Sequence, residues 1–297
     1  MVTLAAIFSP TQPPERIGAV AAAADAAGLA ELWVWEDCFK ESGIATATAM
    51  LAATSRVTVA IGLLPVPLRN VALTAMEIAT LARLFPGRLT AGIGHGVQDW
   101  MAQVGAKAES PMTLLREYTT ALSALLHGET VTAHGRYVHL DGVALDWPPG
   151  VVPPLLVGGI RPRTVSLAGE LADGVIIPGG VPPEEVRAAV GHLRAGRGAR
   201  AAAGTATQAD AGAAPRADAG AAPRAAAGAA PRAATGPGEG VVFISAPAKS
   251  PARDLAATVN EYAAAGATCV AVNADEDDAD IERFAGFLAR EVGPLVR

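Results

Sequence analysis

The feature that most constrains the fold of this chain is a regular alternation of short apolar segments with longer, Ala-rich ones. Eight apolar segments have the length of strands, at 2–8, 32–35, 57–63, 89–93, 154–158, 174–178, 241–245 and 269–273. Segments of helical length follow them, at 15–27, 44–53, 72–84, 111–126, 163–172, 182–195, 252–265 and 279–290. Because parallel strands need such crossover helices, the pattern predicts a closed (β/α)8 TIM barrel, with an open doubly wound sheet as the alternative.

Length and composition agree with a single domain. A barrel of this kind uses about 250 residues, so we expect 1–297 to form one domain. The formal charge of −6 argues against a nucleic-acid surface. Cys38 and Cys269 lack the spacing of a redox pair or a metal site. The chain shows neither a signal-peptide pattern nor an apolar run of membrane-spanning length, so a cytoplasmic protein without a membrane partner is expected.

Two segments interrupt the alternation. Residues 129–150, between the fourth helix and the fifth strand, are predicted to form an inserted hairpin or extended loop that ends at Pro-Pro-Gly. Residues 197–237 contain the octapeptide ADAGAAPR twice and AAAGAAPR once. Each repeat offers only Ala as apolar content and breaks a helix with Gly and Pro, so we predict a flexible low-complexity linker there.

Acid–base candidates follow from the rule that the reacting groups of a β/α barrel lie at the carboxyl ends of its strands. Glu36 and Asp37 follow the second strand, and His95 follows the fourth. Since neighbouring residues of a strand point to opposite sides, only one of the two carboxylates can face a ligand. His95 has either a proton-transfer role or a structural one. Without a second histidine at the strand ends, no metal site is predicted.

The segment 156–166, LVGGIRPRTVS, is a candidate phosphate site. It leaves a strand through Gly158 and Gly159 and enters a helix near Pro162. Free backbone amides at a helix start bind anions, and Arg161 or Arg163 would assist. An ordinary glycine turn is the alternative reading of the same residues.

Several segments resemble one family, the luciferase-like flavin- and F420-dependent oxidoreductases. The stretch 80–96, TLARLFPGRLTAGIGHG, is similar to the helix after strand three and to strand four of that family. The stretches 28–37, 54–70 and 167–176 resemble its second strand, its third strand and its "AxxADGxI" element, in the same order. Together these matches cover most of 1–180, and the branch they resemble is the one of methylenetetrahydromethanopterin reductase-like proteins.

The resemblance implies a luciferase-like barrel that holds coenzyme F420, or alternatively FMN, across its strand ends. It also implies a bulge with a non-prolyl cis peptide in the third strand, around Ile61, Gly62 and Leu63. An ordinary strand that bends at Gly62 is the alternative. The cofactor phosphate would lie at the two glycines and the helix start that follow the fifth strand. The cofactor-binding residues expected on this basis are Ile61, Gly62, Leu63, Gly94, His95, Gly96, Gly158, Gly159, Ile160, Arg161, Arg163 and Thr164.

The chain also departs from the family. Members that oxidise sugar phosphates and alcohols tend to carry Asp-His after strand two and an acidic residue after the strand-four glycines, where this chain has Glu36-Asp37 and Val97. We therefore expect hydride transfer between F420 and a small organic substrate other than a sugar phosphate. The alternatives are an FMN-dependent monooxygenase that uses oxygen and a non-catalytic flavin-binding protein. A homodimer is expected, and a reductase that supplies reduced cofactor is a conceivable partner.

Overall fold

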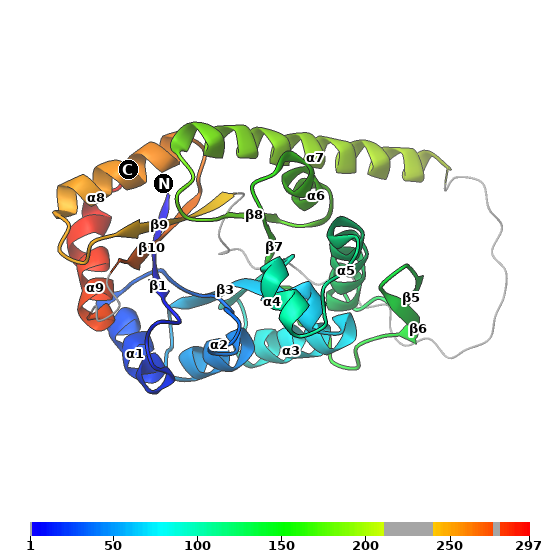
Figure 1. The fold of residues 1–297 in the computed structure, drawn as a ribbon, viewed down its shortest axis with the longest axis horizontal. Coiled ribbons are helices and arrows are strands. Elements are labelled where there is room, and N and C mark those ends of the chain that lie inside the picture. Colours follow the sequence, from blue (N-terminus) through cyan, green and yellow to red (C-terminus); the bar gives the residue numbers. More distant parts are fainter. Residues whose placement is uncertain (1, 211–239, 276–279) are drawn as a thin grey trace.

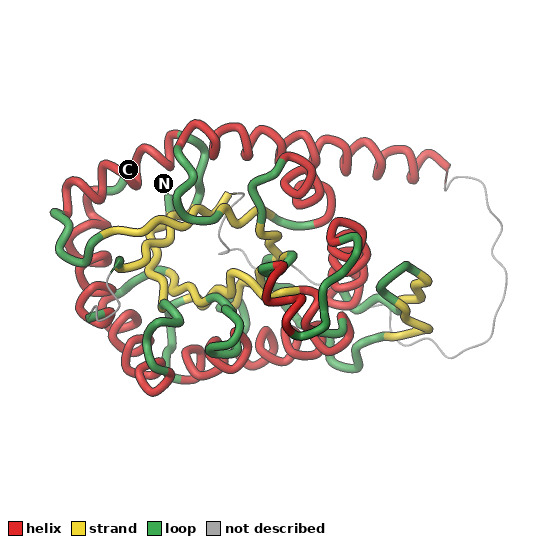
Figure 2. The backbone as a smooth tube through the Cα atoms, in the orientation of Figure 1, coloured by secondary structure: helices red, strands yellow, loops and turns green. Residues whose placement is uncertain are grey.

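Eight parallel strands close into a barrel in a computed structural model that describes residues 2–210, 240–275 and 280–297. The order around the barrel is β1-β10-β9-β8-β7-β4-β3-β2. Figure 2 shows these strands as a ring with the helices outside it. The predicted (β/α)8 barrel is confirmed, and the open-sheet alternative is wrong. The barrel strands are β1 (Thr3–Phe8), β2 (Glu31–Val34), β3 (Thr58–Pro65), β4 (Leu89–Gly94), β7 (Leu155–Gly158), β8 (Gly174–Ile177), β9 (Gly240–Ala246) and β10 (Cys269–Ala274).

The helices follow the strands as the alternation predicts (Figure 1). A short helix after β4, α4 (Gln98–Gln103), is an addition that the alternation did not predict. The last helix continues into a π-helical turn over Leu288–Val292. The remaining helices are α1 (Ile17–Ala27), α2 (Gly43–Ala52), α3 (Val71–Leu84), α5 (Pro111–Leu126), α6 (Pro162–Leu171), α7 (Pro183–Asp210), α8 (Ala252–Ala264) and α9 (Ile281–Phe287).

Strand residues alternate between two separate apolar cores. On β1, Leu4, Ala6 and Phe8 belong to the large core between the strands and the helices. Ala5 and Ile7, at the positions between them, belong to a smaller core enclosed by the barrel. Because both faces of each strand are buried, the strands are continuous apolar runs, which is typical of parallel sheets covered by helices.

The inserted segment forms the hairpin predicted for 129–150. Strands β5 (Val131–His134) and β6 (His139–Val143) pair antiparallel and lie outside the barrel (Figure 1).

The linker predicted from residue 197 begins too early, because α7 continues to Asp210. Close packing of α7 on α6 explains part of this extension: a Cβ atom on Gly196 would come within 2.1 Å of the Ser166 carbonyl oxygen. Gly196, which would weaken an isolated helix, here allows the two helices to approach. The Ala-rich sequence beyond it favours a helix as well. Most of the repeat, 211–237, lies outside the described residues.

Candidate active site

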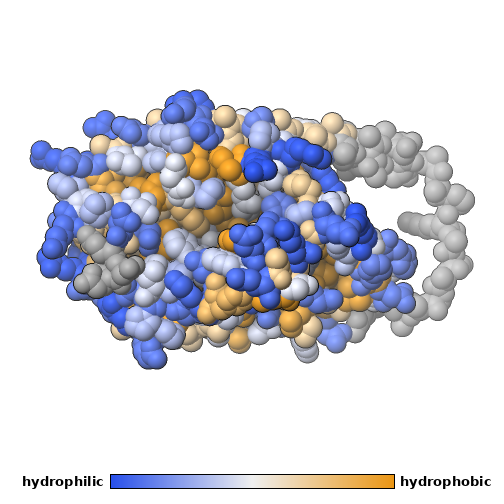
Figure 3. Space-filling view, in the orientation of Figure 1, coloured by the Kyte–Doolittle hydropathy of each residue, from blue (hydrophilic) through white to orange (hydrophobic). Residues whose placement is uncertain are grey.

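A cavity of about 430 Å³ lies at the carboxyl ends of the barrel strands. Its volume is within the range of small-molecule sites. In Figure 3, apolar residues surround a hollow near the middle of the visible face. The lining is formed by Ile7, Trp35, Glu36, Asp37, Gly62, Leu63, Pro65, His95, Gly96, Val97, Trp100, Gly158, Gly159, Ile160, Ile176, Pro178, Gly179, Phe243, Ile244, Ser245 and Asn273.

The two carboxylates after β2 have different surroundings. Glu36 forms an ion pair with Arg69, whose Nη2 donates to Glu36 Oε2 over 2.7 Å. The same carboxylate oxygen accepts the backbone N–H of Gly43 over 2.8 Å, at the first residue of α2. Glu36 is therefore engaged in holding the loop after β2 against Arg69 and α2. Asp37 has no such ion pair among the described residues and lines the cavity.

Burial changes the proton affinity of both remaining acid–base candidates. Burial raises the pKa of Asp37, while Lys40 and the neighbouring Trp35 side chain oppose the shift. Burial lowers the pKa of His95, and the backbone at Pro111 partly opposes that shift. Near neutral pH the His95 imidazole is consequently uncharged. Besides the ion-paired Glu36, the cavity wall thus presents the Asp37 carboxyl group and a neutral imidazole, two groups suited to proton transfer.

The third strand contains the bulge and the cis peptide that the resemblance implied. Its register with β4 shifts between Ile61 and Leu64, and the Gly62–Leu63 peptide bond is cis. This expectation is confirmed. A second non-prolyl cis bond, Cys38–Phe39, was not anticipated. Gly62 and Leu63 line the cavity.

Glycines at the ends of β4 and β7 make room for the Leu63 side chain. A Cβ atom on Gly158 would come within 2.1 Å of Leu63 Cδ2, and one on Gly94 within 2.6 Å of it. Gly96 has a φ of +67°, in the left-handed region that favours glycine. Gly94 and Gly158 let the Leu63 side chain pack against them, whereas a Cβ atom on Gly96 would come within 2.9 Å of Pro65 Cβ. Gly96 and Gly158 also line the cavity, and Gly94 does not.

The start of α6 is open to a ligand in part. Gly158, Gly159 and Ile160 line the cavity, and Arg161 caps the helix without a side-chain hydrogen bond to its amides. The Gly159 amide itself is engaged, since it donates to the Ile176 carbonyl over 2.9 Å. The free donors are thus those of the first helical turn, where an anion is favoured.

Four further predicted cofactor residues lie outside the cavity lining. Arg161 and Arg163 are exposed to solvent beside the start of α6. Thr164 is buried, and its hydroxyl donates to Met112 Sδ over 3.4 Å. Ile61 is buried on the helix side of β3, where its Cγ2 lies 3.2 Å from the Cβ position of Gly43. Direct contact of these residues with a cofactor stays a prediction.

Two buried polar atoms of the cavity wall have no hydrogen-bond partner among the described residues. They are His95 Nδ1 and Asn273 Oδ1. A buried polar atom that is left unpaired costs about 1–3 kcal/mol, which a bound ligand can recover. The cavity wall therefore fits a ligand with hydrogen-bonding groups, such as a polar heterocycle.

Several lining residues were not singled out as site residues from the sequence. Phe243 and Ile176 belong to the core inside the barrel and reach the cavity from below. Their signal was present, since inward residues repeat with period two along each strand. Trp100 lies on α4, which was not predicted, and so carried no signal.

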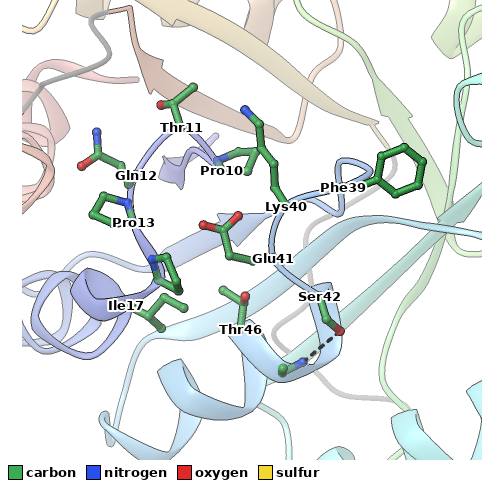
Figure 4. Close-up of a pocket in the computed structure, with 12 residues that line it drawn as sticks. Pro10, Thr11, Gln12, Pro13, Ile17, Phe39, Lys40, Glu41, Ser42 and Thr46 are labelled. Carbon is green, nitrogen blue, oxygen red and sulfur yellow. Dashed lines mark hydrogen bonds between the residues drawn. The ribbon is translucent and has the colours of Figure 1, made fainter. Parts of the chain in front are cut away.

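A larger pocket of about 900 Å³ lies between the loops that follow β1 and β2. Figure 4 shows Lys40 and Glu41 of one loop opposite Thr11 and Gln12 of the other, while the Phe39 ring points away from them. None of the predicted site residues lines this pocket. The loop that carries Asp37 continues directly into it.

Within the described part of the chain, no helix is long and apolar enough to cross a membrane. The same residues contain no group of three or more His, Cys, Asp or Glu placed to hold a metal ion.

The closed barrel and the cavity at its carboxyl end define a (β/α)8 protein with a cavity of the size that holds small organic molecules. The chain belongs to the luciferase-like monooxygenase family, whose model matches residues 2–289.

Curated relatives share about 30% of their residues with the matched part of this chain. The 5,10-methylenetetrahydromethanopterin reductase of Methanolobus tindarius is 30% identical over 189 residues, which are 64% of this chain and 57% of the relative. The F420-dependent glucose-6-phosphate dehydrogenase of Mycobacterium avium (strain 104) is 30% identical over 182 residues, or 56% and 54% of the two chains. The chain thus spans just over half the length of these relatives.

Solved structures share this barrel fold. An F420-dependent secondary alcohol dehydrogenase in complex with an F420-acetone adduct has a TM-score of 0.79 at 16% identity, covering 100% of this chain and 99% of its own. A 3,6-diketocamphane monooxygenase component from Pseudomonas putida, in complex with FMN, has a TM-score of 0.72 at 14% identity, with coverage of 100% and 99%.

Proposed function

We propose that this chain is an F420-dependent oxidoreductase that transfers a hydride between the deazaflavin and a small organic substrate. The observation that carries the proposal is the cavity at the strand ends, whose wall leaves His95 Nδ1 and Asn273 Oδ1 without partners among the described residues. Sequence similarity to reductases and dehydrogenases named for F420 chemistry supports the choice of cofactor. Similarity to an FMN-bound monooxygenase fold is the basis for FMN as the alternative.

The residues of the chain divide the work of binding and proton transfer. When bound, the deazaflavin supplies the site that gives or accepts the hydride. Trp35, Phe243 and Leu63 provide apolar walls that exclude water. The first turn of α6 offers its uncapped amides to the anionic tail. Asp37 gives or takes the proton that accompanies the hydride at its carboxylate, and neutral His95 hydrogen-bonds to the bound heterocycle or substrate.

The charge of the cavity narrows the class of substrate. Among the described residues that line the cavity, none is Lys or Arg. Glu36 is balanced by Arg69, so Asp37 leaves the wall with a net negative character. A phosphate group placed beside Asp37 would be repelled by its carboxylate, and no Lys or Arg of the described cavity lining would offset that repulsion. We therefore propose an uncharged substrate.

A substrate screen with matched pairs tests this proposal. We expect F420-dependent turnover, followed by the deazaflavin absorbance, with neutral alcohols or carbonyl compounds. In each pair, the phosphorylated compound should have a kcat/KM no greater than that of its neutral counterpart, as for glucose 6-phosphate and glucose. The reason is that repulsion between the phosphate and the Asp37 carboxylate, about 1 kcal/mol at about 4 Å in water, is not offset. Preferred turnover of the phosphorylated member would contradict the substrate class. Oxygen consumption with reduced FMN, without F420 turnover, would favour the monooxygenase.

The assembly and partners of the chain are also part of the proposal. A homodimer is supported by apolar side chains that α3 exposes, Leu73, Met76 and Leu84. A reductase that supplies reduced cofactor is needed if the reaction runs in the direction of substrate reduction.

A further inference from the structure

A buried carboxyl group lies inside the barrel, below the cavity and outside its lining. Glu31 begins β2 and is only 3% exposed. Its Oε2 accepts the indole N–H of Trp33 over 2.8 Å and the thiol of Cys269 over 3.2 Å. Trp33 and Cys269 both belong to the core enclosed by the barrel strands. Glu31 is thus a fully enclosed carboxyl group with no role yet in binding or proton transfer.

Trp33 connects this carboxyl group to the floor of the cavity. A Cβ atom on Gly62 would come within 2.7 Å of the Trp33 ring, so the ring lies directly against the backbone of β3. The Trp33 and Phe243 rings meet edge to face with centroids 5.2 Å apart. The Phe243 and Trp35 centroids are 5.7 Å apart. Gly62, Phe243 and Trp35 all line the cavity.

The alternation of β2 explains this arrangement. Residues 31, 33 and 35 point to the same side because side chains repeat every second residue along a strand. Glu31, Trp33 and Trp35 therefore form a ladder from the interior of the barrel to the cavity wall. The Trp33 indole is held between Gly62 and Phe243. A shift of the indole must move these two neighbours as well, because a close-packed core has no space to absorb it.

We propose that Glu31 is a positioning residue that fixes the cavity floor through Trp33, and that the protonation state of Glu31 is thereby transmitted to the cavity.

The proton affinity of Glu31 makes this coupling relevant near neutral pH. Burial raises the pKa of Glu31 to about 7, although the hydrogen bonds from Trp33 and Cys269 oppose the shift. Cys269 on β10 is the titratable group that faces it, and burial together with Glu31 keeps the pKa of that thiol well above its usual range. The other inward residues nearby, Ala5 on β1 and Ala60 on β3, are apolar. Among these groups inside the barrel, ionisation near pH 7 therefore changes the charge on Glu31 and not on Cys269.

The test follows the indole N–H resonances of the ligand-free protein between pH 5.5 and 8.5, assigned with W33F and W35F. We expect the Trp33 and Trp35 resonances to shift with a common midpoint near pH 7. Glu31→Gln should abolish this titration in both, because an amide does not ionise. Asp37→Asn is the matched control: it removes the carboxyl group next to Trp35 and should leave the common titration in place.

Hydrogen exchange of the Trp33 indole N–H tests the hydrogen bond between Trp33 and Glu31. Glu31→Gln keeps an acceptor oxygen and should retain slow exchange, whereas Glu31→Ala should accelerate exchange at least about tenfold, the equivalent of losing one hydrogen bond of about 1.4 kcal/mol. A Trp35 resonance that titrates in Glu31→Gln as in the wild type would overturn the proposal, as would a Trp33 resonance that does not titrate. Because no cofactor is used, these results are independent of which cofactor binds.

Discussion

Replacement of Asp37 by Asn is expected to lower kcat at least about 100-fold while the dissociation constant for F420 changes little. General acid–base groups contribute about 10²–10⁴ to the rate, and an amide can neither give nor take the proton. Because burial raises the pKa of Asp37, activity that needs its carboxylate should fall on acidification at a higher pH than for an exposed aspartate. Steady-state kinetics across pH, with the best substrate of the screen, measures both effects.

Asp99→Asn is the control for that experiment. Asp99 lies in the first turn of α4, near the cavity mouth, but is exposed and outside the lining. The same chemical change should leave kcat within about twofold there, since exposed surface substitutions have small effects. If Asp37→Asn kept wild-type turnover, the proton would have to be handled by another group, and His95 would be the next to test.

Removal of Arg69 is expected to cost about 3 kcal/mol of the free energy of unfolding. Arg69 pairs with Glu36 and also lies 3.3 Å from Glu77 Oε2. The Glu36 and Arg69 side chains are only 8% and 14% exposed, so Arg69→Ala leaves a nearly buried carboxylate without its cation. Breaking such a pair typically costs about 3–5 kcal/mol, and we take the lower end because Glu36 keeps its hydrogen bond from Gly43.

Urea denaturation of Arg69→Ala beside Arg116→Ala measures this cost. Arg116 pairs with Glu170 on the surface, where the two side chains are 51% and 30% exposed. An exposed pair contributes less than about 1 kcal/mol, so Arg116→Ala should be nearly neutral. Equal losses in the two variants would mean that the Glu36–Arg69 pair does not hold the loop of Asp37 in place.

The barrel itself was predictable from the sequence because two independent signals coincide. Apolar runs buried on both faces mark the strands, and Ala-rich segments of helical length separate them. The boundary that failed, at residue 197, depends on a tertiary contact: Gly196 looks like a helix breaker until α6 is seen to pack against it. The hairpin over 129–150 was predictable because it breaks the alternation.

The candidate site was predictable where it depends on strand ends and less so elsewhere. The alternation rule implied that only one of Glu36 and Asp37 faces a ligand, but both line the cavity. They differ in that Glu36 is engaged by Arg69, which is 33 residues away in sequence. Glu31 carried no signal, since a carboxylate at the start of a strand usually lies in solvent. The environment of Glu31 is made by its hydrogen bonds with Trp33 and with Cys269. Cys269 is distant in sequence, so this contact cannot be predicted from the local sequence pattern.

The central claim is that the cavity at the strand ends holds the deazaflavin, and titration of three proteins with F420 and FMN tests it most directly. Gly158 and Gly179 both line the cavity. A Cβ atom on Gly158 would lie only 2.1 Å from Leu63 Cδ2 and would displace that side chain. A Cβ atom on Gly179 would meet only the Phe243 carbonyl oxygen, at 3.6 Å. We predict that the wild type and Gly179→Ala bind F420 equally and more tightly than FMN. Gly158→Ala, with unchanged circular dichroism, should bind F420 at least about tenfold more weakly, a loss of about 1.4 kcal/mol. Equal F420 affinity in all three proteins, or no binding to the wild type, would contradict the claim.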